Sequence, residues 1–274
     1  MDLFQAIVLG IVQGLTEFLP ISSSGHLRIV PAFAGWDDPG TAFTAVIQLG
    51  TMAAVVLYFS ADLLRIARAW SASLRDPSRR AELDARLGWY LIIGTVPIVI
   101  FGFTFQDQIE TGARDLYLIG TMLIVLGLVL LLAEKVSKRD RDLSSITRRD
   151  AILIGCAQSL ALIPGVSRSG ATITAGLLLG MDRVAAARFS FLLSVPAVVL
   201  SGVYEFRHVV DGSAEGAAGL GPTALATVFA FISGYASIAF LLRFLTTHTT
   251  GVFIAYRVAL GTAVLALVAA GAIS

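Results

Sequence analysis

The chain has 274 residues, of which 56% are hydrophobic and only 14% are charged. Soluble domains carry roughly a quarter charged residues, so a mean hydropathy of +0.82 excludes a soluble protein and predicts an integral membrane protein. The net charge of +1 excludes a nucleic-acid-binding protein, because such proteins need an excess of basic residues.

The first apolar stretch, residues 3–19, runs into Pro20 and the sequence ISSSG. Proline lacks an N–H and clashes with the preceding helical turn, so the helix breaks there, and a serine can cap the next short apolar piece, 27–34. Both pieces are shorter than the roughly 20 residues needed to cross a bilayer. We therefore predict a re-entrant helical hairpin over residues 1–34, with a kinked or amphipathic helix as the alternative.

Six later segments are apolar and long enough to cross a bilayer: 43–60, 88–105, 116–133, 186–205, 223–244 and 252–272. The loops 61–87 and 134–150 contain six Lys or Arg residues each, whereas 106–115 and 206–222 contain one each. Basic loops face the cytoplasm. This rule places 61–87 and 134–150 in the cytoplasm and both chain termini outside.

Residues 6–25 recur at 151–170, with eight of twenty positions identical. The second copy also breaks at a proline, Pro164, which separates the apolar pieces 151–163 and 171–180. Three predicted spans separate the copies, and because three is odd the second copy must be inverted, as in many membrane transporters. The predicted fold is an all-α integral membrane protein with six transmembrane helices and two re-entrant hairpins. Its single membrane domain divides into repeats 1–140 and 141–274, the second with its hairpin at 151–180.

Polar residues gather at the two predicted breaks. They are Gln13, Glu17, Ser22, Ser23, Ser24, Gly25 and His26 in the first copy, and Ser167, Arg168, Ser169, Gly170 and Thr172 in the second. Two helix N-termini and an arginine at one place favour an anion with several oxygens. A charged residue at membrane depth is costly and often functional, although Glu17 and Arg168 also suit a structural ion pair. Arg257 lies inside the last span. Its side chain either snorkels to the membrane surface or lines the cavity, and the sequence does not decide between these alternatives.

Two motifs carry a family resemblance. Gln13-x-x-x-Glu17 followed by FLPISSSGH, together with PGVSRSGAT at 164–172, resembles the undecaprenyl pyrophosphate phosphatase family, the bacitracin-resistance proteins. The resemblance implies hydrolysis of undecaprenyl diphosphate to undecaprenyl phosphate and inorganic phosphate, which recycles the lipid carrier for cell-wall synthesis. It also implies a bacterial inner membrane protein whose active site opens to the periplasmic side. By position, the catalytic residues are Glu17, Ser23, His26 and Arg168, and the other polar residues above bind the substrate.

The resemblance leaves several matters open. The attacking group is His26, Ser23 or water, and His26 is alternatively the general base. Glu17, with Gln13, positions a divalent cation, Mg²⁺ or Ca²⁺, or activates the attacking group. The expected partners are a polyprenyl diphosphate and membrane lipids, with no nucleic acid, and the chain is a monomer or a homodimer. The rival hypothesis is an inverted-repeat transporter or flippase for an anionic lipid or small anion. A structural membrane subunit is a third alternative.

Overall fold

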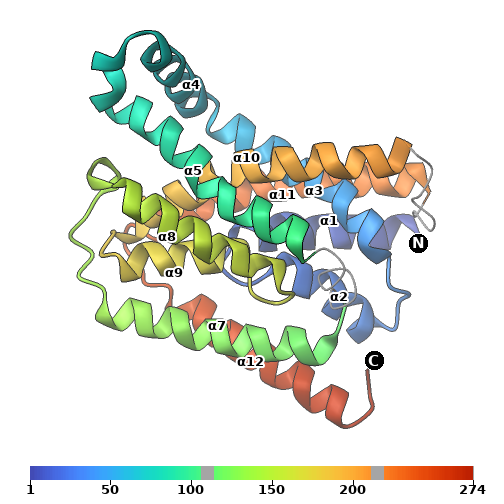
Figure 1. The fold of residues 1–274 in the computed structure, drawn as a ribbon. Coiled ribbons are helices and arrows are strands. Elements are labelled where there is room, and N and C mark those ends of the chain that lie inside the picture. The colour runs from blue at the N-terminus through green and yellow to red at the C-terminus, as the bar shows by residue number, and fades with distance from the viewer. Residues whose placement is uncertain (106–113, 211–218, 274) are drawn as a thin grey trace.

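The computed structural model describes residues 1–105, 114–210 and 219–273, and its ribbon is drawn in Figure 1. These residues form helices joined by short connections, and their only β-type pairing is an isolated bridge between Arg141 and Met181. Of the predicted outer loops 106–115 and 206–222, residues 106–113 and 211–218 lie outside the described residues. The predicted all-α class is therefore confirmed for the part of the chain that the structure describes.

The first sequence copy folds into a helical hairpin of α1 (Leu3–Phe18) and α2 (Ser23–Ala34). α1 begins with a capping box in which Asp2 and Gln5 each bind the other's backbone N–H, which satisfies two donors that a helix end leaves open. The helix ends two residues before Pro20, as the proline requires.

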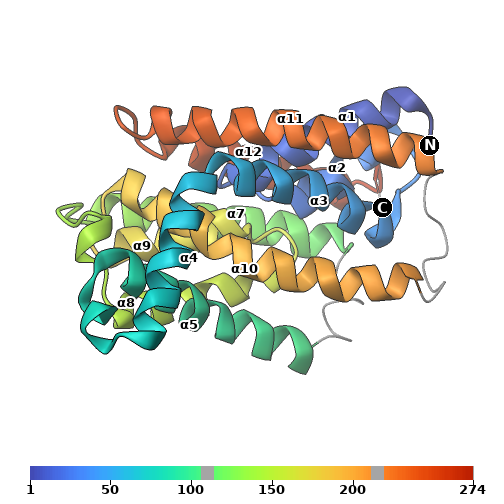
Figure 2. The ribbon, with the colours of Figure 1, turned by 90° about the horizontal axis from the view of Figure 1, so that it is seen from above.

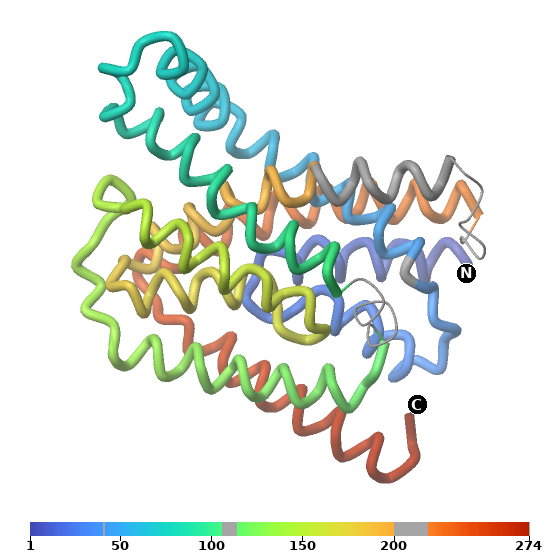
Figure 3. The backbone as a smooth tube through the Cα atoms, viewed as in Figure 1, coloured from blue at the N-terminus to red at the C-terminus, as the bar shows by residue number. Residues whose placement is uncertain are grey.

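The second sequence copy folds in the same way. α8 (Arg148–Ser159) begins with a capping box of Thr147 and Asp150, continues into the short 3-10 helix η3 (Leu160–Leu162), and is followed by α9 (Arg168–Leu178). Figure 1 shows that the first hairpin has its open end beside the N-terminus, on the right, whereas the second has its open end on the left. The tube in Figure 3 shows that both turns lie near the middle of the molecule.

Long apolar helices surround the hairpins. Those long and apolar enough to cross a membrane, among the described residues, are α5 (Leu83–Thr104), α7 (Leu116–Val136), α11 (Leu220–Phe244) and α12 (Gly251–Ala269). The apolar part of α3 (Gly40–Tyr58) and α4 (Ser60–Arg75) form one further candidate, bent by 73°. The predicted segment 186–205 lies within α10 (Arg183–Val210). The chain is thus a multi-pass membrane protein, and all the regular elements among its described residues are helices.

The segment 61–87, which the sequence predicts as a basic loop, is largely helical. It contains most of α4 and the 3-10 helix η1 (Pro77–Ala81). Its arginines lower the hydropathy, but their spacing leaves an apolar face on which Ile66 is buried and Trp70 packs over Gly88 of α5. An amphipathic helix of this kind carries the charge of a loop and still packs as a helix.

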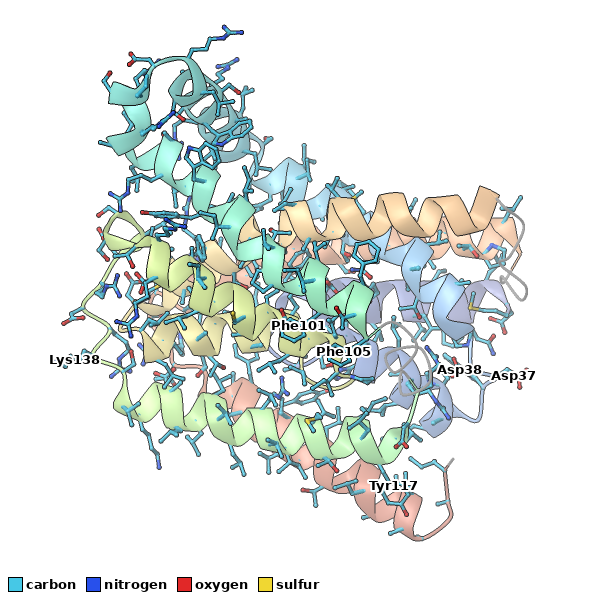
Figure 4. The ribbon with its side chains drawn as sticks, in the orientation of Figure 1. Asp37, Asp38, Phe101, Phe105, Tyr117 and Lys138 are labelled. Carbon is cyan, nitrogen blue, oxygen red and sulfur yellow. The ribbon has the colours of Figure 1, made fainter. Side chains whose placement is uncertain are left out.

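The basic segments and the chain termini lie at opposite ends of the molecule. The α4–α5 connection and the α7–α8 connection, which includes η2 (Leu143–Ser145), lie at the left of Figure 1. Both termini lie at the right in Figures 1 and 2. In the side-chain view of Figure 4, Lys138 lies at the left end, and Asp37 and Asp38 lie at the right. This is the distribution that the positive-inside rule needs.

Equivalent glycines pack the first helix of each hairpin against a long helix. A Cβ atom at Gly10 of α1 would lie 2.3 Å from the carbonyl oxygen of Ala226 in α11. A Cβ atom at Gly155 of α8, the same position of the repeat, would lie 2.3 Å from the carbonyl oxygen of Gly94 in α5. Small residues let membrane helices approach backbone to backbone. The two hairpins are thus held in place by the same contact on different helices.

Candidate active site

The turns of the two hairpins have the same backbone conformation. Ser22 has φ 76° and ψ 99°, and Ser167 has φ 74° and ψ 118°. Residues with a Cβ atom rarely adopt positive φ, and such strained residues are common at functional sites. Each serine hydroxyl accepts a hydrogen bond from the N–H three residues on, at Gly25 (3.4 Å) and Gly170 (3.1 Å). The predicted residues Ser22 and Ser167 therefore cap α2 and α9.

The carboxylate of Glu17 joins the two turns. Its Oε1 accepts a charge-assisted hydrogen bond from Arg168. Its Oε2 accepts hydrogen bonds from the Ser23 hydroxyl (2.6 Å) and the Gln13 amide (3.2 Å). The Glu17 side chain is 8% exposed and the Arg168 side chain 16% exposed. The fold thus brings three of the predicted residues, from both hairpins, around the nearly buried carboxylate of Glu17.

The other hydroxyls at the turns mostly support this geometry. The Ser169 hydroxyl donates to the Leu19 carbonyl at 2.9 Å and so forms a second link between the hairpins. The buried Thr172 hydroxyl lies 2.6 Å from that of Ser190 in α10 and donates to the Arg168 carbonyl at 2.8 Å. Ser24, in contrast, is exposed, with its hydroxyl 3.4 Å from that of Ser22.

His26 lies beside the same turn but contacts different groups. Its Nδ1 is 2.7 Å from the Ser22 carbonyl oxygen and its Nε2 is 2.7 Å from the Tyr256 hydroxyl. A carbonyl can only accept, so Nδ1 carries a proton, and in the neutral imidazole Nε2 then accepts from Tyr256. The two rings are also stacked, with centroids 5.5 Å apart. His26 is therefore bonded to α12 and does not form a hydrogen bond with Glu17 or Ser23 in this structure.

Two residues of α12 were not assigned to the site from the sequence. The motifs do not include Tyr256, and the sequence does not decide between snorkelling and lining the cavity for Arg257. In the structure Arg257 is fully buried at the turns, where it donates to backbone carbonyls of both hairpins, including those of Pro20 and Val166. Arg257 therefore does not snorkel. A signal was present, because a Tyr-Arg pair stands in the first half of an otherwise apolar span.

The turns offer oxygen donors of the kind that Mg²⁺ and Ca²⁺ prefer. Only the amide nitrogen of Gln13 can donate to Glu17, so its Oε1 is left over, and this oxygen is buried without a hydrogen-bond partner. No three His, Cys, Asp or Glu side chains gather at one place in the described residues. The donor set fits a cation that takes most of its ligands from phosphate oxygens and water.

Comparisons with known proteins identify the family of the chain. The family model described as "Bacitracin resistance protein BacA" matches residues 6–263. The chain is 56% identical over 273 residues to the undecaprenyl-diphosphatase of a Nocardioides species, an alignment that covers 100% of this chain and 99% of that protein. It is 53% identical to the undecaprenyl-diphosphatase of Chlorobaculum parvum, with 99% of both chains covered. It is 50% identical to undecaprenyl-diphosphatase 2 of Streptomyces avermitilis, with 100% of this chain and 97% of that protein covered. With both motifs at one site and these matches over nearly its full length, the chain belongs to the bacitracin-resistance protein family.

Proposed function

We propose that this protein is an integral membrane phosphatase that hydrolyses undecaprenyl diphosphate to undecaprenyl phosphate and inorganic phosphate. This reaction returns the lipid carrier to cell-wall synthesis and confers bacitracin resistance. The relatives named undecaprenyl-diphosphatase support the activity. The observation that carries it in the structure is the Glu17 carboxylate, which holds the Ser23 hydroxyl and the Arg168 guanidinium together.

Arg168 and the helix ends bind the diphosphate head. Arg168 presents a planar set of N–H donors that matches phosphate oxygens. α2 and α9 both begin at the site, and the positive ends of their dipoles favour an anion. Charge grows on the leaving phosphate as the P–O bond breaks, and fixed donors stabilise that charge without reorganisation. Only the head group needs these contacts, and the polyprenyl tail stays in the lipid.

Glu17 acts as the base for the attacking group. The Ser23 hydroxyl already donates to its Oε2 at 2.6 Å, within the range for direct proton transfer. Ser23 loses this proton to Glu17 as its oxygen attacks the terminal phosphorus and the bond to the bridging oxygen breaks, which releases undecaprenyl phosphate. Water then hydrolyses the phosphoserine and releases inorganic phosphate. Where a water molecule attacks in place of Ser23, inorganic phosphate forms directly. His26 is hydrogen-bonded to Tyr256 rather than to Ser23, so the Tyr256 hydroxyl orients the imidazole ring, and Glu17 rather than His26 takes the proton of the Ser23 hydroxyl.

A divalent cation, Mg²⁺ or Ca²⁺, would be held by Glu17 and by Gln13, whose Oε1 has no hydrogen-bond partner. When bound, it neutralises negative charge on the diphosphate oxygens. The amide nitrogen of Gln13 donates to Glu17, so the amide oxygen is left without a hydrogen-bond partner next to that carboxylate.

The two halves, 1–140 and 141–274, form an inverted repeat with two re-entrant hairpins and six spans in the bacterial inner membrane. The matching capping boxes, the matching strained serines and the opposite openings of the hairpins support this arrangement. The basic end faces the cytoplasm, the termini lie outside, and the site opens to the periplasmic side. The chain works as a monomer or a homodimer.

Thiol labelling tests the orientation. In a Cys156→Ala background, which removes the exposed native cysteine, Asp37→Cys should react with an impermeant maleimide in intact cells. Lys138→Cys should react only after the cells are opened. The two positions lie at opposite ends of the molecule in Figure 4, so the reverse pattern would show that the orientation is wrong.

Phosphate release tests the activity. Purified protein in detergent should release inorganic phosphate from undecaprenyl diphosphate without any ion gradient, and EDTA should suppress the release. A transporter or flippase needs two compartments and would release no phosphate in detergent. Glu17→Gln serves as the control for contaminating phosphatases, because its preparation should contain the same contaminants and no specific activity.

A further inference from the structure

Arg257 is a charged side chain to which neither family motif assigns a role. It lies in α12 and is 0% exposed, and within the described residues its guanidinium donates only to backbone carbonyls. The acceptors are Leu123 (3.1 Å, from Nε), Pro20 and Val166 (3.1 Å each, from Nη1), and Met122 (3.2 Å), Gly165 and Val166 (3.1 Å each, from Nη2).

These carbonyls come from three separate parts of the chain. Pro20 belongs to the turn of the first hairpin, Gly165 and Val166 belong to the turn of the second, and Met122 and Leu123 lie in α7. One rigid fork of donors therefore fixes the two turns relative to each other and to a long helix. A lysine cannot make this set of contacts, because it has three donors at one point and no planar fork.

The acceptors also matter electrostatically. At each turn one helix ends and another begins, so carbonyl oxygens with partial negative charge lie next to N–H groups with partial positive charge. An anion is attracted by the N–H groups and repelled by the carbonyls. Arg257 binds the carbonyls of both turns and leaves the starts of α2 and α9 for the anion.

The charge of Arg257 has no carboxylate partner. Among the described residues its hydrogen bonds all go to carbonyls, and it takes part in none of the ion pairs. It is also close to the site, since a Cβ atom at Gly170, in the first turn of α9, would lie 3.0 Å from its Nη1. A buried cation is costly unless an anion offsets it, and the diphosphate is the anion that this site is proposed to bind.

We infer that Arg257 is a positioning residue for diphosphate binding and hydrolysis. It holds the turns of the two hairpins in register, neutralises their carbonyl groups, and supplies a positive charge behind the binding site. This inference rests on the proposed function, which makes a diphosphate the ligand. It adds a third element, α12, to a site that the sequence motifs place on the two hairpins alone.

The experiment compares Arg257→Lys, which keeps the charge without the fork, and Arg257→Met, which removes both. Arg243→Met is the matched control, because Arg243 is an exposed arginine at the end of α11. For each protein we would measure kcat and KM on undecaprenyl diphosphate, the Kd for inorganic pyrophosphate by calorimetry, and thermal unfolding in detergent.

For Arg257→Met we expect kcat/KM to fall by at least about 100-fold and the pyrophosphate Kd to rise by about 10-fold or more, as for a lost charged hydrogen-bond network. For Arg257→Lys we expect about a 10-fold fall in kcat with a smaller change in Kd, since the charge stays. Arg243→Met should match the wild type in every measurement.

A purely structural role predicts a lower unfolding temperature with unchanged kcat and Kd in the folded protein, and this result for Arg257→Lys would overturn the inference. If Arg257→Met does not fold, Arg257→Lys decides the question alone. If wild-type protein releases no phosphate, the proposed function fails. The pyrophosphate Kd values of the wild type and Arg257→Lys still test the inference then, with equal values counting against it.

Discussion

The turns of the two hairpins have nearly the same backbone and different chemistry. Ser22 and Ser167 occupy the same position of the repeat and share the same strained conformation and the same cap. At the position after each, the first copy has Ser23 and the second has Arg168. Both side chains bind Glu17. A repeated frame thus places a hydroxyl and a guanidinium on either side of one carboxylate, which a site of identical halves could not do.

The second copy lacks two of the polar residues of the first, so the two hairpins carry different chemical groups. Leu162 stands where the first copy has Glu17, and Ala171 stands where it has His26. Gln158 is the counterpart of Gln13, but with Leu162 beside it both of its amide atoms are buried without a partner. In the proposed mechanism, the first hairpin carries the acid–base groups, and the second carries Arg168, whose guanidinium binds the diphosphate.

Replacement of Glu17, the carboxylate that both turns bind, should lower the activity more than any other substitution. Glu17→Gln keeps the shape but removes the proton acceptor and leaves Arg168 without its carboxylate, so we expect kcat to fall by about 1,000-fold or more. Phosphate release from undecaprenyl diphosphate measures it. Retention of more than a tenth of wild-type activity would show that Glu17 is not the base.

Replacement of Arg168 should have the next largest effect. Arg168→Lys keeps the charge and loses the fork, so kcat/KM should fall by about 100-fold. Arg168→Ser gives the second turn the residue of the first, and its kcat/KM should be lower still. Near-normal turnover by the lysine variant would remove the reason for an arginine at this position, and circular dichroism would confirm that both variants are folded.

Removal of the Tyr256 hydroxyl should have a moderate effect. Tyr256→Phe keeps the ring stacked on His26 but removes the hydrogen bond to Nε2, so the imidazole loses an orienting contact and kcat should fall by about 10-fold. His26→Ala is the reference. If it retains full activity, His26 has no part in the reaction, and a change in Tyr256→Phe would then have another cause.

Replacement of Gln13 or Gln158, which occupy the same position of the repeat, should have the smallest effect on activity, and the two variants should differ clearly from each other. Gln158→Leu removes a buried amide with no partner, so it should leave activity unchanged and stabilise the fold by about 1 kcal/mol. Gln13→Leu should instead lower kcat/KM by about 10-fold, because it removes a donor to Glu17 and an oxygen for the cation. Thermal unfolding and phosphate release measure both variants. Equal losses of activity would show that the two positions are equivalent after all.

Local sequence determined much of this protein. Hydropathy marks the apolar helices because crossing lipid requires about 20 apolar residues, and proline with glycine and serine marks the breaks because they stop one helix and cap the next. The residues around Glu17 were also predictable, since a repeat whose copies depart from each other at polar positions indicates a site between them.

Tertiary structure alone decided the rest. The arginines of α4 predict a loop from the sequence, but the segment is helical because Ile66 and Trp70 give it an apolar face, and Trp70 packs against α5. His26 contacts Tyr256, and Arg257 contacts carbonyls of both hairpins, because α12 packs beside turns that precede Arg257 by more than 90 residues. Backbone carbonyls carry no sequence signature, so a guanidinium that binds only carbonyls shows its partners only when the chain is folded.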